Sequence, residues 1–122
     1  MSLSEADLQS AIITWANTQV GKYPELKWLH AIPNGGRRDA KEAMALKSQG
    51  VKAGILDLSL DVARGGFHGL KIELKKPGKN CLKPSQEQSE YIDFCIDQGY
   101  ECIVSNDFEQ VKKLIISYLE LK

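Results

Sequence analysis

The stretches Gly54-Ile55-Leu56-Asp57-Leu58 and Leu70-Lys71-Ile72-Glu73-Leu74-Lys75-Lys76 decide how this chain folds. Both are aliphatic runs typical of β-strands, and each carries an acid in its middle. We expect strands over 55–62 and 67–76, joined by a hairpin at Arg64-Gly65-Gly66. An acid inside an apolar strand needs a partner, so these two acids are the first candidates for a functional site.

Proline, glycine and capping patterns divide the rest of the chain. Ser2-x-x-Glu5 and Ser85-x-x-Gln88 have the spacing of capping boxes, and Gly50 and Gly99 are expected to end helices. The further elements we expect are helices at 2–19, 37–49, 85–98 and 107–121, and strands at 28–32 and 100–104. The order α-β-α-β-β-α-β-α predicts an α/β fold, a mixed β-sheet flanked by helices.

Length and composition limit the class of protein. The chain has 122 residues, 43% hydrophobic and 26% charged, which predicts one globular domain over 1–122. No apolar run approaches the ~20 residues of a membrane span. The three cysteines share no CxxC spacing, which favours free thiols in a reducing, cytoplasmic setting.

The charge is zero overall but unevenly distributed. Residues 37–52 hold five basic side chains against two acids, and residues 71–83 hold five lysines against Glu73 alone. Residues 84–110 hold seven acids and no Lys or Arg. One basic face on a neutral molecule would attract phosphate, although solvated surface charge explains the pattern equally well.

The pattern Glu73-x-Lys75 places both side chains on one face of a strand, with Leu74 turned into the core. If the hairpin pairs the two strands, Asp57 and Glu73 lie within reach of one cation. Oxygen ligands favour Mg²⁺ or Mn²⁺, with the backbone carbonyl of Leu74 as a further ligand. Without a cation, two close carboxylates raise the pKa of one of them. The alternative is an ion pair on an exposed strand face.

Glu5 and Gln88 each have two interpretations. Each is the third helical residue of a capping-box pattern. Each also shares a helix face with apolar residues, so we expect both side chains to point toward the sheet, where a metal–water cluster would supply a polar partner. His30 and His68 lack ligand spacing and are not expected to act in catalysis.

Asn34-Gly35-Gly36-Arg37-Arg38 matches neither a Walker loop nor a dinucleotide loop. Backbone amides and guanidinium groups suit a DNA phosphate, although a plain turn before a helix fits as well. The nucleic-acid contacts we expect are Asn34, Gly35, Gly36, Arg37, Arg38, Lys41, Lys52 and Lys76.

Five blocks in order resemble the virus-type replication-repair nuclease (VRR-NUC) family of the PD-(D/E)XK nucleases, in its stand-alone phage or bacterial form. These blocks are Glu5-x-x-x-Gln9, Pro33-Asn34-Gly35-Gly36, Gly50 to Leu58, Ile72-Glu73-Leu74-Lys75 and Ser85-x-x-Gln88. The family commonly has Pro before the motif Asp, where this chain has Leu56. Proline there shapes the backbone and ligates nothing, so no functional group is lost.

The resemblance implies a restriction-endonuclease-like core and Mg²⁺- or Mn²⁺-dependent hydrolysis of DNA phosphodiester bonds. Asp57, Glu73 and Glu5 would be metal ligands, Lys75 the charge-stabilising or water-orienting residue, and Gln88 an accessory positioner. It also implies a homodimer acting on branched DNA such as four-way (Holliday) junctions or flaps, in the cytoplasm of a bacterium or phage-infected host, with no membrane or organic cofactor involved.

Two other classes of function remain open at the level of sequence. A non-catalytic nucleic-acid-binding module could retain the nuclease fold, although it would not need Asp57, Glu73 and Lys75 together. A small structural or interaction protein is favoured only by the neutral net charge.

Overall fold

The computed structural model describes residues 3–33, 39–78 and 82–122. Its central feature is an antiparallel hairpin of β2 (Leu58–Leu60) and β3 (Leu70–Leu74). Gly65 and Gly66 form the turn with φ of +58° and +86°, values that match the twist of antiparallel strands and that glycine adopts at no steric cost. The predicted hairpin is confirmed, but its strands are shorter than the expected 55–62 and 67–76, and Asp57 precedes β2 instead of lying within it.

The described strands form one mixed sheet in the order β1-β2-β3-β4. β1 (His30–Ala31) pairs antiparallel with β2, and β4 (Glu101–Ser105) pairs parallel with β3. The predicted strand over 28–32 is wrong in its first half, because Pro24 opens a 3₁₀ helix, η1 (Pro24–Trp28). The proline lacks an N–H and has its φ fixed for a helical start, so only two residues remain to pair with β2.

Four α-helices complete the described fold: α1 (Glu5–Thr18), α2 (Ala40–Ser48), α3 (Gln86–Asp97) and α4 (Phe108–Leu119). Gly50 and Gly99 follow α2 and α3 with φ of +103° and +91°, as predicted for glycines that end helices. Ser85 caps α3 in a capping box with Gln88, also as predicted. At α1 the N-cap is Ser4 and its capping box is with Asp7, so the expectation that Glu5 is the third helical residue is wrong; Ser2 lies outside the described residues.

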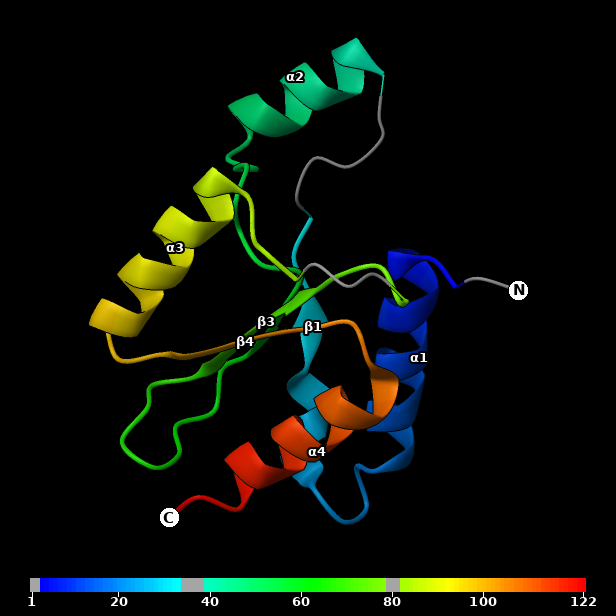
Figure 1. The fold of residues 1–122 in the computed structure, drawn as a ribbon, viewed down its shortest axis with the longest axis vertical. Helices are drawn as coiled ribbons and strands as arrows, with labels where there is room; N and C mark the ends of the chain where they lie inside the picture. The colour runs from blue at the N-terminus through cyan, green and yellow to red at the C-terminus, as the bar shows by residue number, and fades with distance from the viewer. Residues whose placement is uncertain (1–2, 34–38, 79–81) are drawn as a thin grey trace.

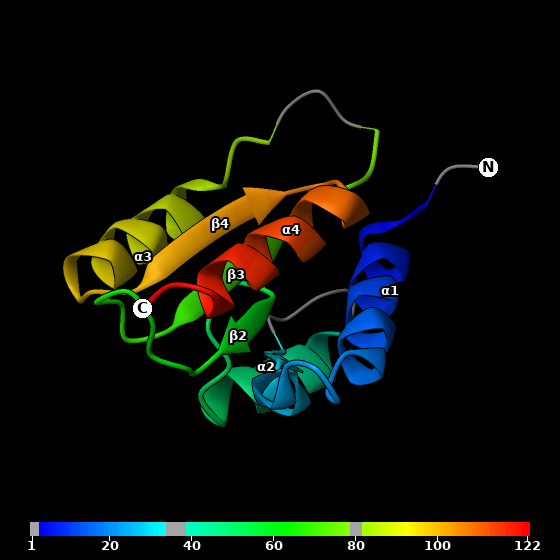
Figure 2. The same ribbon diagram turned by 90° about the horizontal axis from the view of Figure 1, so that it is seen from below.

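The helices cover the two faces of the sheet unequally. α1 and α4 lie on one face and α3 on the other, as Figures 1 and 2 show. Ile12 of α1, Ile72 of β3 and Ile115 of α4 are each fully buried in the core between the helices and the sheet. Burying an aliphatic side chain of this size stabilises a fold by roughly 1.5–3 kcal/mol. The core therefore lies on the α1/α4 face, which leaves the α3 face for polar side chains.

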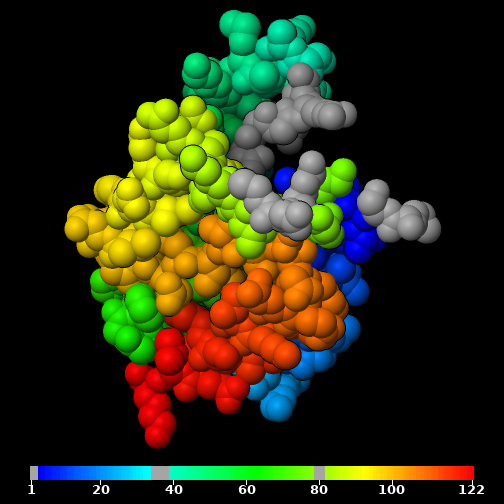
Figure 3. All heavy atoms as spheres, viewed as in Figure 1, coloured from blue at the N-terminus to red at the C-terminus, as the bar shows by residue number. Residues whose placement is uncertain are grey.

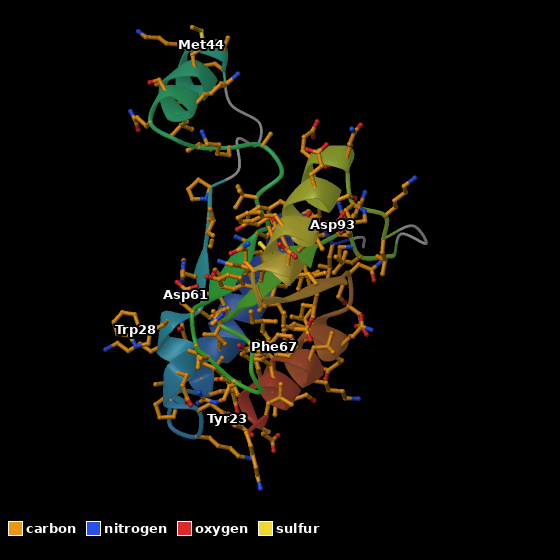
Figure 4. The ribbon with its side chains drawn as sticks, turned by 90° about the vertical axis from the view of Figure 1, so that its left-hand side faces the viewer. Tyr23, Trp28, Met44, Asp61, Phe67 and Asp93 are labelled. Carbon is orange, nitrogen blue, oxygen red and sulfur yellow. The ribbon has the colours of Figure 1, made fainter. Side chains whose placement is uncertain are left out.

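α2 stands apart from these layers and has no buried residue. It projects from the body in the space-filling view (Figure 3), and Met44 on it is 72% exposed (Figure 4). Within the described residues, no helix combines the length and the apolar character needed to cross a membrane.

Candidate active site

Asp57 immediately precedes β2 and reaches across to the neighbouring strand. Its Oδ2 accepts a 2.8 Å hydrogen bond from the backbone N–H of Leu74, and its own carbonyl accepts a 2.9 Å bond from Ile32. One bond therefore fixes the carboxylate beside the last residues of β3, and the other fixes the main chain that carries it. This confirms the expectation that pairing of the two strands brings Asp57 to Glu73.

Glu73 and Lys75 share one face of β3, while Leu74 points into the core at 1% exposure. The Glu73 side chain is buried on the α3 face at 3% exposure, and the Lys75 side chain is partly buried. Lys75 Nζ lies 3.4 Å from Glu73 Oε2. The alternation of a strand thus separates one aliphatic side chain from two charged ones, as predicted.

Gln88, in the first turn of α3, joins these two side chains. Its Nε2 donates a 2.6 Å hydrogen bond to Glu73 Oε2, and its Oε1 accepts a 2.9 Å bond from Lys75 Nζ. The same Oε1 accepts a 3.0 Å bond from the backbone N–H of Ser85, which completes the capping box. Both interpretations of Gln88 are therefore correct at once: it caps α3 and it belongs to the polar cluster.

Glu73 differs from the other buried polar side chains of the described chain, Ser59 and Ser105. Both serines are satisfied: Ser59 accepts from Lys71 and donates to Asp61, and Ser105 bonds the Gln110 side chain. Glu73 Oε1, in contrast, is buried and receives no hydrogen bond. A buried acceptor without a donor costs roughly 1–3 kcal/mol, so this oxygen is available to a further partner.

Burial, and then the nearby carboxylate of Asp57, raise the pKa of Glu73 from 4.5 to about 7, against the opposing effect of Lys75. Two carboxylate oxygens repel unless a proton or a cation lies between them. The predicted rise in pKa for one member of the pair is confirmed, and near neutral pH the pair can exchange a proton for a cation.

The donor set fits a hard divalent cation. It consists of two adjacent carboxyl groups, one with a buried unsatisfied oxygen, and the strand backbone at Leu74. In the described part of the chain no group of three or more His, Cys, Asp and Glu side chains is arranged to hold a metal ion. Any cation here would therefore depend on main-chain oxygen and water beside the two acids.

Residues at the end of β4 fix the backbone of this site. The N–H of Lys75 donates a 2.9 Å bond to the carbonyl of Ser105, and Asn106 Nδ2 donates a 3.3 Å bond to the carbonyl of Lys76. The sequence interpretation missed both residues. These contacts join residues 30 apart in the chain, so no local motif could have indicated them.

A structural relative identifies the family. No protein-family model and no curated protein matches the chain. A solved structure of a "VRR_NUC domain protein" matches 99% of this chain and 92% of that chain, with a TM-score of 0.81 and 34% sequence identity. The chain belongs to the VRR-NUC family.

This VRR-NUC chain is thus a domain of a nuclease family, and the predicted mixed α/β fold is confirmed. Glu5 is the first residue of α1 and is exposed, so its side chain is not buried against the sheet as expected. Leu8 and Ile12, which share its helix face, are buried, so Glu5 lies on the expected face but one turn before the buried part of α1 begins. The role of Glu5 as a metal ligand stays a prediction.

Three of the residues expected to contact nucleic acid lie in the described part of the chain, and their role stays a prediction. Lys41 on α2, Lys52 in the loop after it, and Lys76 after β3 are all exposed. Residues 34–38, which include Arg37 and Arg38, lie outside the described residues. The free thiols expected from cysteine spacing are present at Cys95 and Cys102, while Cys81 lies outside the described residues.

Proposed function

We propose that this chain is a Mg²⁺- or Mn²⁺-dependent endonuclease that hydrolyses phosphodiester bonds in branched DNA. The observation that supports it most is the buried Glu73 carboxyl, which has one unsatisfied oxygen and contacts both Gln88 and Lys75. A buried acid next to a second acid and a cationic side chain suits chemistry in which negative charge develops on phosphate. Membership of a nuclease family supports the same conclusion.

Asp57 and Glu73 would hold the cation, together with the backbone carbonyl of Leu74. Glu5, at the start of α1, would contact the cation or its water. When bound, such a cation supplies Lewis-acid polarisation of the phosphate and of water. The 2.8 Å bond from the N–H of Leu74 keeps one oxygen of Asp57 in place, which leaves its carboxylate oriented toward Glu73.

Lys75 would orient the attacking water or offset the charge that develops on the phosphoryl oxygens. Its ammonium group is fixed by Gln88 Oε1 at 2.9 Å and by Glu73 at 3.4 Å. Because its side chain is only 18% exposed, little rearrangement of water is required when charge develops nearby. Gln88 acts on both neighbours, donating to the acid and accepting from the amine.

DNA would be recognised through its backbone and shape. Lys41, Lys52 and Lys76 offer exposed cations for phosphate contacts, and residues 34–38 add two arginines in sequence. Because the chain carries no net charge, attraction to DNA would come from these side chains and not from the charge of the molecule as a whole. A two-fold homodimer would present two active sites to a two-fold four-way junction, and this match of symmetry would favour branched substrates.

The test is cleavage of labelled duplex, single-stranded, flap and four-way DNA in Mg²⁺, in Mn²⁺ and in EDTA. We expect metal-dependent cutting that falls by roughly 100-fold or more in Lys75→Ala, with DNA binding and folding retained. Lys113→Ala, which removes an exposed lysine from α4, is the matched control and should cut normally. A folded protein that binds DNA but cuts no substrate in either metal would favour the non-catalytic binding module.

A further inference from the structure

The loop that leads to Asp57 meets the first turn of α3 at Gly54. A Cβ placed on Gly54 would lie 2.7 Å from both the carbonyl carbon and the carbonyl oxygen of Glu87, and 2.8 Å from its Cβ. Carbon atoms in ordinary contact are ~3.5–4.0 Å apart. The two backbones therefore approach closely only because residue 54 has no side chain.

This contact lies next to the polar cluster. The carbonyl carbon of Glu87 forms the peptide bond to Gln88, whose side chain bonds Glu73 at 2.6 Å and Lys75 at 2.9 Å. Relieving a 2.7 Å overlap requires a shift of roughly 0.8 Å. If α3 moved away by that amount, the Gln88 bond to Lys75 would exceed hydrogen-bond length and the bond to Glu73 would be stretched beyond the usual ~2.7–3.2 Å range.

Backbone conformation alone does not account for Gly54. Its φ of +88° favours glycine, but Gly50, Gly66 and Gly78 share a positive φ, and a Cβ on any of them would have no atom within 4 Å. Gly65 and Gly99 approach the side chains of Leu121 and His68, which rotate about their own bonds. At Gly54 the neighbour is the backbone of a helix, which moves only with the helix.

We propose that Gly54 is a positioning residue of the active site. Its missing side chain seats the first turn of α3 against the loop of Asp57, which places Gln88 between Glu73 and Lys75. The inference deepens the proposed nuclease function and rests on it only where cleavage is the readout. This role distinguishes Gly54 from glycines that are required only for a positive φ.

A double-mutant cycle tests this assignment. Gly54→Ala should lower kcat for DNA cleavage by about 10- to 100-fold with little change in KM, because a shift of under 1 Å misplaces Gln88. In a Gln88→Ala background, adding Gly54→Ala should lower kcat by less than about threefold. Gly66→Ala is the matched control: its φ of +86° imposes the same backbone strain without a contact, so kcat should stay unchanged. Additive losses in the double variant would overturn the proposal.

A second readout does not depend on activity. In NMR spectra, Gly54→Ala should shift the side-chain amide signals of Gln88, and Gly66→Ala should leave them in place. If the wild type cuts no DNA, the nuclease proposal fails while these signals still decide the role of Gly54. Unmoved Gln88 signals would overturn the positioning role. A Gly54→Ala protein that does not fold, beside a folded Gly66→Ala protein, would overturn it too, because the contact would then sustain the fold.

Discussion

At the scale of single residues, burial of the Glu73 side chain costs the folded state stability. It is 3% exposed, one of its oxygens receives no hydrogen bond, and burial, followed by the carboxylate of Asp57, raises its pKa. An apolar residue on the same strand face would remove all these costs. Sequences depart from local consistency in this way mainly at functional sites, which supports a role for Glu73 in binding and chemistry.

The pKa of Glu73 predicts how stability depends on pH without metal. The pKa is 4.5 in the unfolded chain and about 7 in the folded protein. Between these values the folded state binds more protons, so the free energy of unfolding should fall as pH rises from 4.5 to 7. The loss should be on the order of 3–4 kcal/mol at most, from ~1.4 kcal/mol for each pKa unit.

Urea unfolding in EDTA across this pH range measures the effect. Glu73→Gln should remove most of the fall, because the amide does not titrate. Glu120→Gln, which changes an exposed glutamate near the end of the chain, should keep the wild-type profile. If Glu73→Gln and the wild type show the same slope, the carboxyl is not the group that titrates.

At the scale of elements, α3 links helix capping to the site. Ser85→Ala removes the oxygen that accepts from the N–H of Gln88 and should destabilise the protein by about 1 kcal/mol. Because Gln88 belongs to the same capping box, cleavage should also fall. Ser85→Thr keeps a capping hydroxyl and should restore both properties. Unfolding midpoints and cleavage rates measure them, and a loss of stability with full activity would show that the cap does not place Gln88.

The elements show what the sequence could and could not predict. The hairpin, its glycines, the capping box of α3 and the helix-ending glycines were predicted because each depends on local backbone chemistry. The start of α1 was not, because Ser2 and Ser4 are each followed three residues later by an acid, and local spacing does not choose between them. That ambiguity placed Glu5 at the third helical position, whereas it is the first residue of α1.

Some contacts of the candidate site could be predicted from the sequence and others could not. Asp57, Glu73 and Lys75 were predicted to meet because a hairpin and strand alternation bring them together, and Gln88 because its helix face was apolar. The contacts of Ser105 and Asn106 depend on how β4 pairs with β3, and the close approach of Gly54 depends on where α3 docks. Neither can be obtained from local spacing, since both are set by packing between distant segments.

At the scale of the whole molecule, a neutral chain should bind DNA through local charge. Lys41 lies on α2, which projects from the body and has no buried residue, so substitution there should spare the fold. Lys41→Ala should weaken binding to all sequences equally and reduce the salt dependence of log K by about one. Fluorescence anisotropy at several salt concentrations measures this, with Lys113→Ala on α4 as the control. If log K depends on salt concentration equally in the two variants, α2 does not contact DNA.

The central claim is that Asp57 and Glu73 form one site for a divalent cation. Calorimetric titration of Mn²⁺ into the metal-free protein at pH 7.5 tests it most directly, beside Glu73→Gln as the nearly isosteric variant. We predict that the wild type binds Mn²⁺ and that the variant binds at least about 100-fold more weakly, because a neutral amide replaces a charged ligand. Equal binding by both proteins, or binding by neither, would contradict the claim.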